Sequence, residues 1–353
     1  MQFVVVALLF ASGLYLVIRG GGFVVSGVMK IGEGFNLPPV FVGMTLLALA
    51  TSAPEIFITL IAAAGGEYGM AIGNTVGGMT ATLSVTLGIY AITSPTVIDR
   101  RGAMPHILAL FLSLVVLFIV VSDGRATIWE GGALLILFAI FVAYGIYTTR
   151  TNRVQMQEKA RNTGGMSGIL SQNAQKTPTY ATQTTISSAQ ITANSTPDIS
   201  MPRALWFLVA GQILLVMGAI LIVQNGERLA QIFGMSETMV GFTIMALGTS
   251  SPEIVTIMTA ARRGRGDMAL GNILGSNVIS STILLGGAAI AADIFGSGLR
   301  IDVSGSLVVF AVLLFFTVIA TIPILVRGRM CRIHGVILAT LYVSYLLYLF
   351  LWG

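Results

Sequence analysis

Two matching stretches carry hydroxyls, a proline and a carboxylate inside long apolar runs. One reads Ala-Leu-Ala-Thr-Ser-Ala-Pro-Glu and ends at Glu55, and the other reads Ala-Leu-Gly-Thr-Ser-Ser-Pro-Glu and ends at Glu253. A proline removes a backbone donor and disturbs the preceding turn, which predicts free carbonyl oxygens near Ala48 and Ala246. Carboxylate, hydroxyl and carbonyl oxygens are the ligands that hard cations take. The two stretches therefore predict a cation-binding site.

The two glutamates are unusual because of their apolar surroundings. An ionised side chain at the centre of a membrane helix costs at least about 3 kcal/mol on insertion scales, so a functional role is the first hypothesis. Ionised Glu55 and Glu253 together would balance one divalent cation or two monovalent cations, which is an electrostatic basis for exchange. The alternative is a structural role in which both acids bond to backbone groups.

A second pair of motifs follows the first and adds polar groups. GNTVGGM at residues 73–79 parallels GNILGSN at residues 271–277. We expect the first asparagine of each motif to bond to the backbone of a broken helix rather than to an ion. Ser276 and Asn277 are better ligand candidates, and hydrogen bonding between helices is their alternative role.

The composition places these motifs in a membrane. Of the 353 residues, 55% are hydrophobic and 9% are charged, whereas a soluble domain has roughly 25% charged residues. A helix needs about 20 apolar residues to cross the hydrocarbon core, and many segments are that long. The sequence therefore predicts an all-α membrane protein. The net charge of +5 is better explained by the positive-inside rule than by a nucleic-acid partner, and we expect no nucleic acid.

Hydrophobic segments predict ten transmembrane helices. The two longest exceed what a bilayer requires, which predicts that they are tilted. The first span is rich in glycine, which indicates either close packing with a neighbour or a helix that slides. The ten spans are residues 2–29, 39–64, 69–93, 104–122, 127–149, 203–232, 237–262, 267–293, 304–327 and 333–352.

The basic residues predict the orientation of these spans. Among the Lys and Arg residues in the loops, Arg125, Arg228 and Arg300 fall on one side and the others on the opposite side. Because basic loops stay in the cytoplasm, both termini should be extracytoplasmic. Residues 150–202 are rich in Thr, Ser, Gln and Asn and predict a flexible cytoplasmic linker, either a plain connector or a regulatory segment. The linker divides the chain into halves 1–149 and 203–353.

The halves contain an internal repeat. Residues 43–88 align with residues 241–286 without a gap, at the spacing that separates Glu55 from Glu253. Each half has five predicted spans, and because five is odd, the second half begins on the opposite side of the membrane. Inverted repeats whose broken helices meet near the midplane are typical of secondary transporters. We therefore expect two inverted five-helix repeats with the site between them.

The repeated motifs resemble the α-repeats of the sodium/calcium exchangers, in the calcium/cation antiporter superfamily. The resemblance is strongest over 43–88 and 241–286 and extends to ten spans with a central cytoplasmic loop. It implies that the first and sixth helices slide to switch access, and that paired glutamates, nearby hydroxyls and freed carbonyls bind calcium and sodium. The ligands implied at matching positions are Glu55, Glu253, Thr51, Ser52, Thr249, Ser250, Ser276 and the carbonyls of Ala48 and Ala246.

The chain departs from the family pattern at several positions. It has Ala50 where glycine is usual and Gly78 where serine is usual. Where the family tends to place an amide or a carboxylate, this chain has Thr82 and Ser280, which we include as candidate ligands. The site is therefore less polar than the family's, and the coupling ion and stoichiometry stay open.

These observations predict a secondary active antiporter of the cell (inner) membrane that exchanges Ca²⁺ for Na⁺ by alternating access. Transported ions and membrane lipid are the expected ligands and partners, with no cofactor and no obligate protein partner. One alternative is an exchanger driven by H⁺ or another monovalent cation. A passive channel is less favoured, because a deep site with two acids binds ions too tightly for fast conduction. A protease using Asp267 is less favoured because aspartyl chemistry needs two carboxylates.

Overall fold

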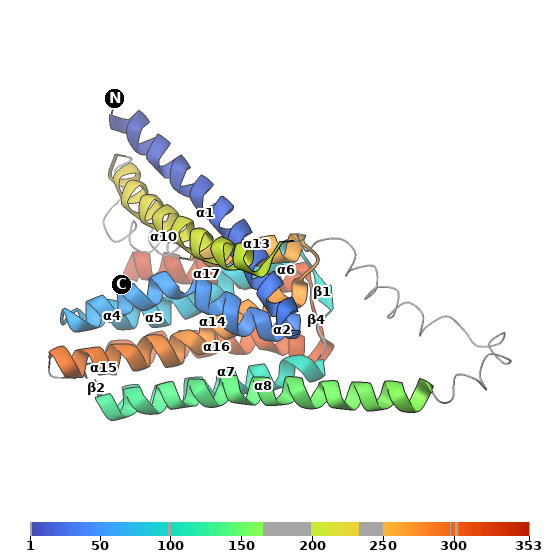
Figure 1. The fold of residues 1–353 in the computed structure, drawn as a ribbon. Coiled ribbons are helices and arrows are strands. Elements are labelled where there is room, and N and C mark those ends of the chain that lie inside the picture. Colours follow the sequence, from blue (N-terminus) through green and yellow to red (C-terminus); the bar gives the residue numbers. More distant parts are fainter. Residues whose placement is uncertain are drawn as a thin grey trace.

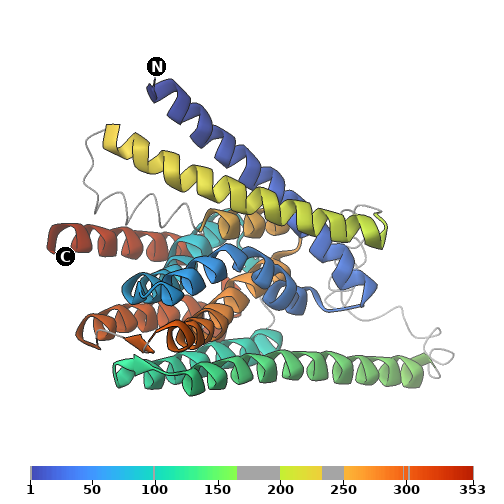
Figure 2. The same ribbon diagram turned by 60° about the vertical axis from the view of Figure 1, so that its left-hand side comes forward.

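The computed structural model describes residues 2–97, 100–164, 199–232, 250–296, 298–300 and 303–352. The described chain is a bundle of long helices joined by turns and two-residue strands, which confirms the prediction of an all-α fold (Figure 1). Helices α1 (Gln2–Gly34) and α10 (Met201–Ile232) cross the bundle obliquely and lie side by side in both views (Figures 1 and 2).

Helices α1 and α10 approach each other closely because small residues recur along both. A Cβ atom added at Gly20 would lie 2.8 Å from the carbonyl oxygen of Gly211, and one added at Gly211 would lie 2.8 Å from that of Gly20. Gly13 meets Gly218 in the same way. Close backbone contact of this kind is how small residues join membrane helices. The close packing expected of the glycine-rich first span is therefore confirmed.

The segment that ends in Glu55 belongs to a broken helix. It comprises α2 (Pro39–Val42), a π-helical turn η1 (Gly43–Leu47), α3 (Ala48–Thr51) and α4 (Ala53–Ala64). The two parts meet at an angle of 50° at Ser52. Pro54 lies in the first turn of α4, where its missing N–H disturbs the fewest hydrogen bonds. The break predicted from this proline is confirmed.

In each half, the helix that bears the glutamate is followed by a helix with the second motif, a π-helical turn and a further helix. In the first half they are α5 (Tyr68–Ala81), η2 (Thr82–Thr86) and α6 (Leu87–Thr93). In the second half, α13 (Ser251–Arg262) is followed by α14 (Gly266–Ile279), η5 (Ser280–Leu284) and α15 (Leu285–Phe295). The bounds of α4, α5 and η2 recur in α13, α14 and η5 at the spacing that separates Glu55 from Glu253. The repeat is thus visible in the backbone of the described residues.

The remaining helices and the strands join the two halves. Helices α7 (Arg100–Ser122) and α8 (Ile128–Gly164) follow in the first half, and α16 (Val303–Arg327) and α17 (Arg332–Trp352) in the second. Strand β1 (Thr96–Val97) pairs antiparallel with β4 (Arg329–Met330), and β2 (Arg125–Ala126) with β3 (Leu299–Arg300). Each pair takes one strand from each half.

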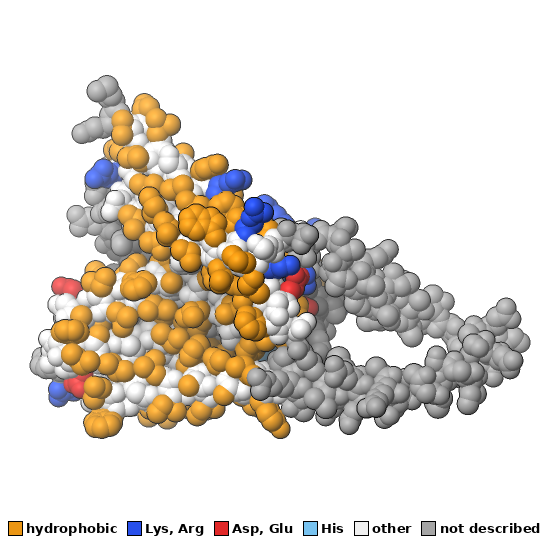
Figure 3. Space-filling view, in the orientation of Figure 1, with side chains coloured by type: hydrophobic (Ala, Val, Ile, Leu, Met, Phe, Trp, Pro, Cys, Tyr) orange, Lys and Arg blue, Asp and Glu red, His pale blue; other side chains and the backbone are white. Residues whose placement is uncertain are grey.

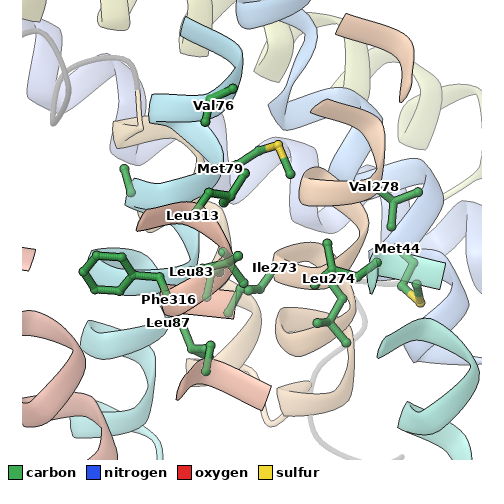
Figure 4. Packing of buried hydrophobic residues seen from close by; sticks show 14 of the residues in the cluster. Met44, Val76, Met79, Leu83, Leu87, Ile273, Leu274, Val278, Leu313 and Phe316 are labelled. Atoms are coloured by element: carbon green, nitrogen blue, oxygen red, sulfur yellow. The ribbon is translucent and has the colours of Figure 1, made fainter. Parts of the chain in front are cut away.

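The core lies where the second motifs of the two halves pack together. Figure 4 shows Met79 and Leu83 of the first half lying toward Ile273 and Leu274 of α14 and toward Leu313 and Phe316 of α16. These side chains are buried. Helix α14 also meets the broken helix, because a Cβ atom added at Gly275 would collide with the Met44 backbone. The core thereby fixes the site-bearing segments of the two halves against each other.

The outer surface has the character of a membrane protein. Hydrophobic side chains cover the helices on the face seen in Figure 3, and charged side chains lie toward their ends. Seven described helices are long and apolar enough to span a membrane, or up to eight with the bent pair, and Arg332–Tyr348 is a shorter apolar helix. The chain is therefore a multi-pass membrane protein, and the count of ten spans stays a prediction.

The linker begins differently from the prediction. Helix α8 continues to Gly164, beyond the expected end of its span at residue 149. Residues 150–164 contain Gln, Glu, Lys, Ala and Arg, which have high helix propensity and can extend a helix into water. Residues 165–198, the larger part of the predicted linker, lie outside the described residues.

Candidate functional site

Glu55 and Glu253 occupy equivalent places at the starts of two helices. Each lies in the first turn after a proline, Glu55 in α4 and Glu253 in α13. The break residues before these helices have the same backbone conformation, with φ −84° and ψ 2° at Ser52 and φ −80° and ψ 0° at Ser250. The positive end of a helix dipole stabilises a carboxylate in the first turn. The repeated sequence thus places each glutamate in the same backbone environment, the first turn of a helix after a proline.

The structure brings the two carboxylates together in the interior. The Oε2 atoms of Glu55 and Glu253 are both enclosed, and neither has a hydrogen-bond partner in the described residues. Glu55 is near enough for its negative charge to act on the Glu253 carboxylate, and Thr51 of the first half lies beside the same carboxylate. A pair of close, buried carboxylates needs a positive counter-charge or protons. The arrangement is therefore suited to holding a cation between the halves.

The carbonyl of Ala48 is not free, contrary to the prediction. It accepts the backbone N–H of Ser52 at 2.9 Å and the Thr51 hydroxyl at 3.1 Å. The acceptor that loses its donor to Pro54 is instead the carbonyl of Ala50, four residues before the proline. To ligate an ion through Ala48, the Thr51 hydroxyl would have to turn away.

Four buried hydroxyls near the breaks and π-helical turns form no hydrogen bond with a described residue. Three belong to candidate ligands, and the fourth belongs to Thr86 in η2. Most buried Ser and Thr side chains of the described bundle bond to a carbonyl one turn earlier, as Thr80 does to Val76 at 2.9 Å. The hydroxyls of Ser52, Ser250 and Thr82 are buried but form no hydrogen bond with a described residue. Ser52 and Ser250 are repeat-related. The hydroxyl oxygens of these three candidates are therefore not used in hydrogen bonds with described residues.

The other candidate side chains of the second half differ in their contacts. Ser280, the repeat partner of Thr82, is half-buried and begins η5, as Thr82 begins η2. The Ser276 hydroxyl donates to the carbonyl of Ile273 at 3.2 Å. The Asn277 amide donates to the same carbonyl at 2.7 Å, and its Oδ1 is enclosed without a described donor. Single π-helical turns within helices often mark functional sites.

Two predicted ligands cannot be placed. Ala246 and Thr249 lie outside the described residues. The described part of the second stretch begins at Ser250, so the second half of the site is represented by Ser250, Glu253 and the polar groups of α14 and η5.

The asparagines that open the second motifs behave differently from each other. The Asn74 amide donates to the Glu55 carbonyl at 3.4 Å and to the Thr59 hydroxyl at 2.8 Å. The expected bond to the backbone of a broken helix is thus confirmed for Asn74. Asn272 instead accepts the Thr51 hydroxyl of the other half at 3.3 Å. The contact between Thr51 and Asn272 joins residues far apart in the chain, and sequence spacing alone did not reveal it.

A multi-pass helical bundle with two acids in the first turns of repeat-related helices, α4 and α13, defines the class of membrane ion transporters. The family model described as "Sodium/calcium exchanger protein" matches residues 5–147 and 203–351. The chain belongs to this family, which confirms the resemblance drawn from the repeated motifs. It is therefore a transporter rather than an enzyme.

Individual relatives and solved structures agree with this assignment. An uncharacterized membrane protein of Methanocaldococcus jannaschii is 29% identical over 81% of this chain and 80% of its own length. The sodium/calcium exchanger MaX1 of Methanosarcina acetivorans is 26% identical over 97% of this chain and 98% of its own length. A structure of the sodium-calcium exchanger NCX_Mj soaked with Na⁺ and Ca²⁺ has a TM-score of 0.71 at 25% identity, covering 96% of this chain and 97% of that chain.

Proposed function

We propose that the chain exchanges Ca²⁺ for Na⁺ by alternating access at a site between Glu55 and Glu253. The observation that carries the proposal is the meeting of these two enclosed carboxylates, one from each half of the chain. Two ionised carboxylates balance one Ca²⁺ or two Na⁺, so either loading neutralises a buried pair that is unfavourable when empty. Competition of the two ions for the same negative charge would couple their movement.

The proposed ligands are oxygen atoms around this pair. The hydroxyls of Ser52, Ser250 and Thr82 are available, and those of Thr51, Ser276 and Ser280 lie on the same segments. Calcium takes 6–8 oxygen ligands at about 2.4 Å, more than two carboxylates supply, so hydroxyl, amide and carbonyl oxygens must complete its shell. The full proposed set is Glu55, Glu253, Thr51, Ser52, Thr249, Ser250, Ser276, Asn277, Thr82, Ser280 and the carbonyl of Ala246. The Ala48 carbonyl joins this set only when the Thr51 hydroxyl turns away from it.

We infer that the fold consists of ten spans in two inverted five-helix repeats, with both termini extracytoplasmic and the linker cytoplasmic. The strand pairs support this arrangement. Strands β1 and β4 lie in loops predicted to be cytoplasmic, and they pair with each other. Strands β2 and β3 lie in loops predicted to be extracytoplasmic, and they also pair. If the number of spans between two paired loops were wrong by one, the loops would lie on opposite sides of the membrane and their strands could not pair. The cell membrane is the proposed location.

The pair formed by α1 and α10 is the proposed moving part. Its two helices pack on each other along their small residues, and both views place it along one side of the bundle. A rigid pair that slides along the broken helices would expose the site to each side in turn. In the NCX_Mj work the solved states concern extracellular ion exchange and induced occlusion of the binding site.

The coupling ion has one open alternative. Thr82 and Ser280 make the site less polar than the family pattern, so an exchanger driven by H⁺ or another monovalent cation remains the second candidate. Calcium movement in proteoliposomes, driven in turn by gradients of sodium, potassium and protons, distinguishes the two. Calcium movement that continues without any counter-ion would instead indicate a channel.

Calcium uptake into sodium-loaded vesicles tests the proposed site. We expect Glu55→Gln and Glu253→Gln each to abolish uptake, because one remaining carboxylate cannot balance Ca²⁺. Glu67→Gln is the matched control, since Glu67 is an exposed acid just after α4 and its loss should leave uptake unchanged. Near-normal uptake by both site variants would refute the proposal.

A further inference from the structure

The repeat-related residues Asn74 and Asn272 have unequal anchors. Asn74 is held within its own half by Thr59 at 2.8 Å and by the Glu55 carbonyl at 3.4 Å. Asn272 is fully buried, and its Oδ1 faces the Thr51 hydroxyl of the other half at 3.3 Å. Its amide nitrogen is enclosed and has no hydrogen-bond partner in the described residues. Asn74 and Asn272 are therefore equivalent in the sequence repeat but form different hydrogen bonds.

The difference follows from two substitutions between the repeats. Ile257 occupies the position that Thr59 has in the first half, and a hydrocarbon side chain cannot accept a hydrogen bond. The Glu253 carbonyl already accepts the Thr256 hydroxyl at 3.1 Å, so the second anchor of Asn74 also has a competitor in the second half. Without an anchor in its own half, Asn272 turns its oxygen toward Thr51.

The Thr51 hydroxyl has one proton and two hydrogen-bond acceptors among the described residues, and it lies beside the Glu253 carboxylate. The acceptors are the Ala48 carbonyl at 3.1 Å and Asn272 Oδ1 at 3.3 Å, and a rotation of the hydroxyl would aim its proton at Glu253 instead. When the proton points to Glu253, the hydroxyl stabilises the empty carboxylate. When it points to Asn272 or Ala48, the lone pairs of the same oxygen can face a cation beside Glu253.

We propose that Asn272 is a positioning residue that raises the cation affinity of the site by drawing the Thr51 proton away from Glu253. This inference rests on the proposed function. Asn272 does not touch the ion in this scheme, since it acts through Thr51. Its oxygen favours the hydroxyl orientation that suits a bound ion over the orientation that suits an empty site.

A double-mutant cycle on calcium uptake tests the inference. We expect Asn272→Ala to raise the KM for Ca²⁺ about fivefold, the effect expected for one neutral hydrogen bond, with a smaller change in maximal rate. In the Thr51→Ala background the same substitution should change the KM little, because the hydroxyl is already gone. A general structural role predicts an equal effect in both backgrounds, and that result would overturn the inference.

Ile257→Thr tests the same idea without removing a side chain. A hydroxyl at position 257 gives Asn272 the anchor that Thr59 gives Asn74, so Asn272 should leave Thr51 and the KM for Ca²⁺ should rise. Ser113→Ala is the control, because it breaks another buried hydrogen bond between the halves, to Ser281 at 2.8 Å. It should leave the KM unchanged. If Ile257→Thr folds with the wild-type KM, the inference is wrong.

Failure of this inference can be separated from failure of the proposed function. Loss of uptake in Glu55→Gln and Glu253→Gln, together with additive effects of Asn272→Ala and Thr51→Ala, would leave the function standing and remove the role of Asn272. Absence of sodium-driven calcium uptake in the wild-type chain would remove the function itself. Calcium binding to the purified protein, measured by calorimetry, gives the cycle a second readout that does not depend on transport rates.

Discussion

The guanidinium group of Arg263 donates a hydrogen bond to the Ser26 hydroxyl at 2.7 Å and so joins the loop after α13 to α1. It also donates to the Gly22 carbonyl at 3.3 Å. Arg265 adds an ion pair with Glu33 near the end of the same helix, again at 3.3 Å. The repeat-related residues in the first half are Gly65 and Glu67, which offer no guanidinium. These contacts therefore attach the α1–α10 pair to the bundle asymmetrically.

We expect Arg263→Gln to weaken this attachment and to favour opening on the side where the loop lies. A hydrogen bond from a charged donor contributes about 1.5–3 kcal/mol, enough to shift a two-state equilibrium by tenfold or more. The KM for Ca²⁺ should change, as measured in vesicles of both orientations. Arg262→Gln is the control, because Arg262 is exposed and adjacent. An equal response of both arginine variants would contradict the role of Arg263 in attaching α1 to the bundle.

The free hydroxyls lead to a prediction about sodium. Thr82→Val and Ser250→Ala each remove an oxygen that forms no hydrogen bond with a described residue, so we expect a higher KM for Na⁺ with little loss of thermal stability. Thr317→Val is the matched control, because the Thr317 hydroxyl bonds to the Leu313 carbonyl at 2.8 Å instead. Sodium dependence of calcium release from loaded vesicles measures the effect. Unchanged sodium dependence in both variants would exclude these hydroxyls as ligands.

The contact between α1 and α10 predicts a strong effect of small substitutions. Gly20→Ala places a methyl group against the Gly211 carbonyl, and overpacking of this kind costs typically about 1–3 kcal/mol. We expect a lower thermal midpoint in detergent and reduced transport. Gly132→Ala in α8 should be neutral, because nothing lies within 4 Å of the added Cβ position. Equal stability of the two variants would show that the helices separate easily.

The proposed orientation predicts which loops can be labelled from each side. In a Cys331→Ser background, a cysteine at Arg262 should react with an impermeant reagent from the cytoplasmic side. A cysteine at Asp123, which is exposed near strand β2, should react from the opposite side. Labelling of both from one side would disprove the span count.

The class of protein and the position of the breaks could be predicted from the sequence. Hydropathy follows from local composition, and Pro54 withholds a donor from the turn before it, so the membrane fold and the bend at Ser52 could be predicted locally. Proline alone does not decide a break, because α7 and α16 continue through Pro105 and Pro323. The alignment of residues 43–88 with 241–286 predicted the matching bounds of the described repeats for the same reason, because equal local sequences build equal local structure.

Only the tertiary structure decided which polar groups are occupied. Asn272 reaches Thr51 in the other half rather than the backbone of its own, whereas Asn74 finds Thr59 and the Glu55 carbonyl within its own half. A hydrogen bond depends on which acceptors compete within about 3 Å, and distant parts of the chain supply those competitors. The sequence therefore determined which oxygens and carboxylates enter the membrane, and packing between the halves determined which of them are left for an ion.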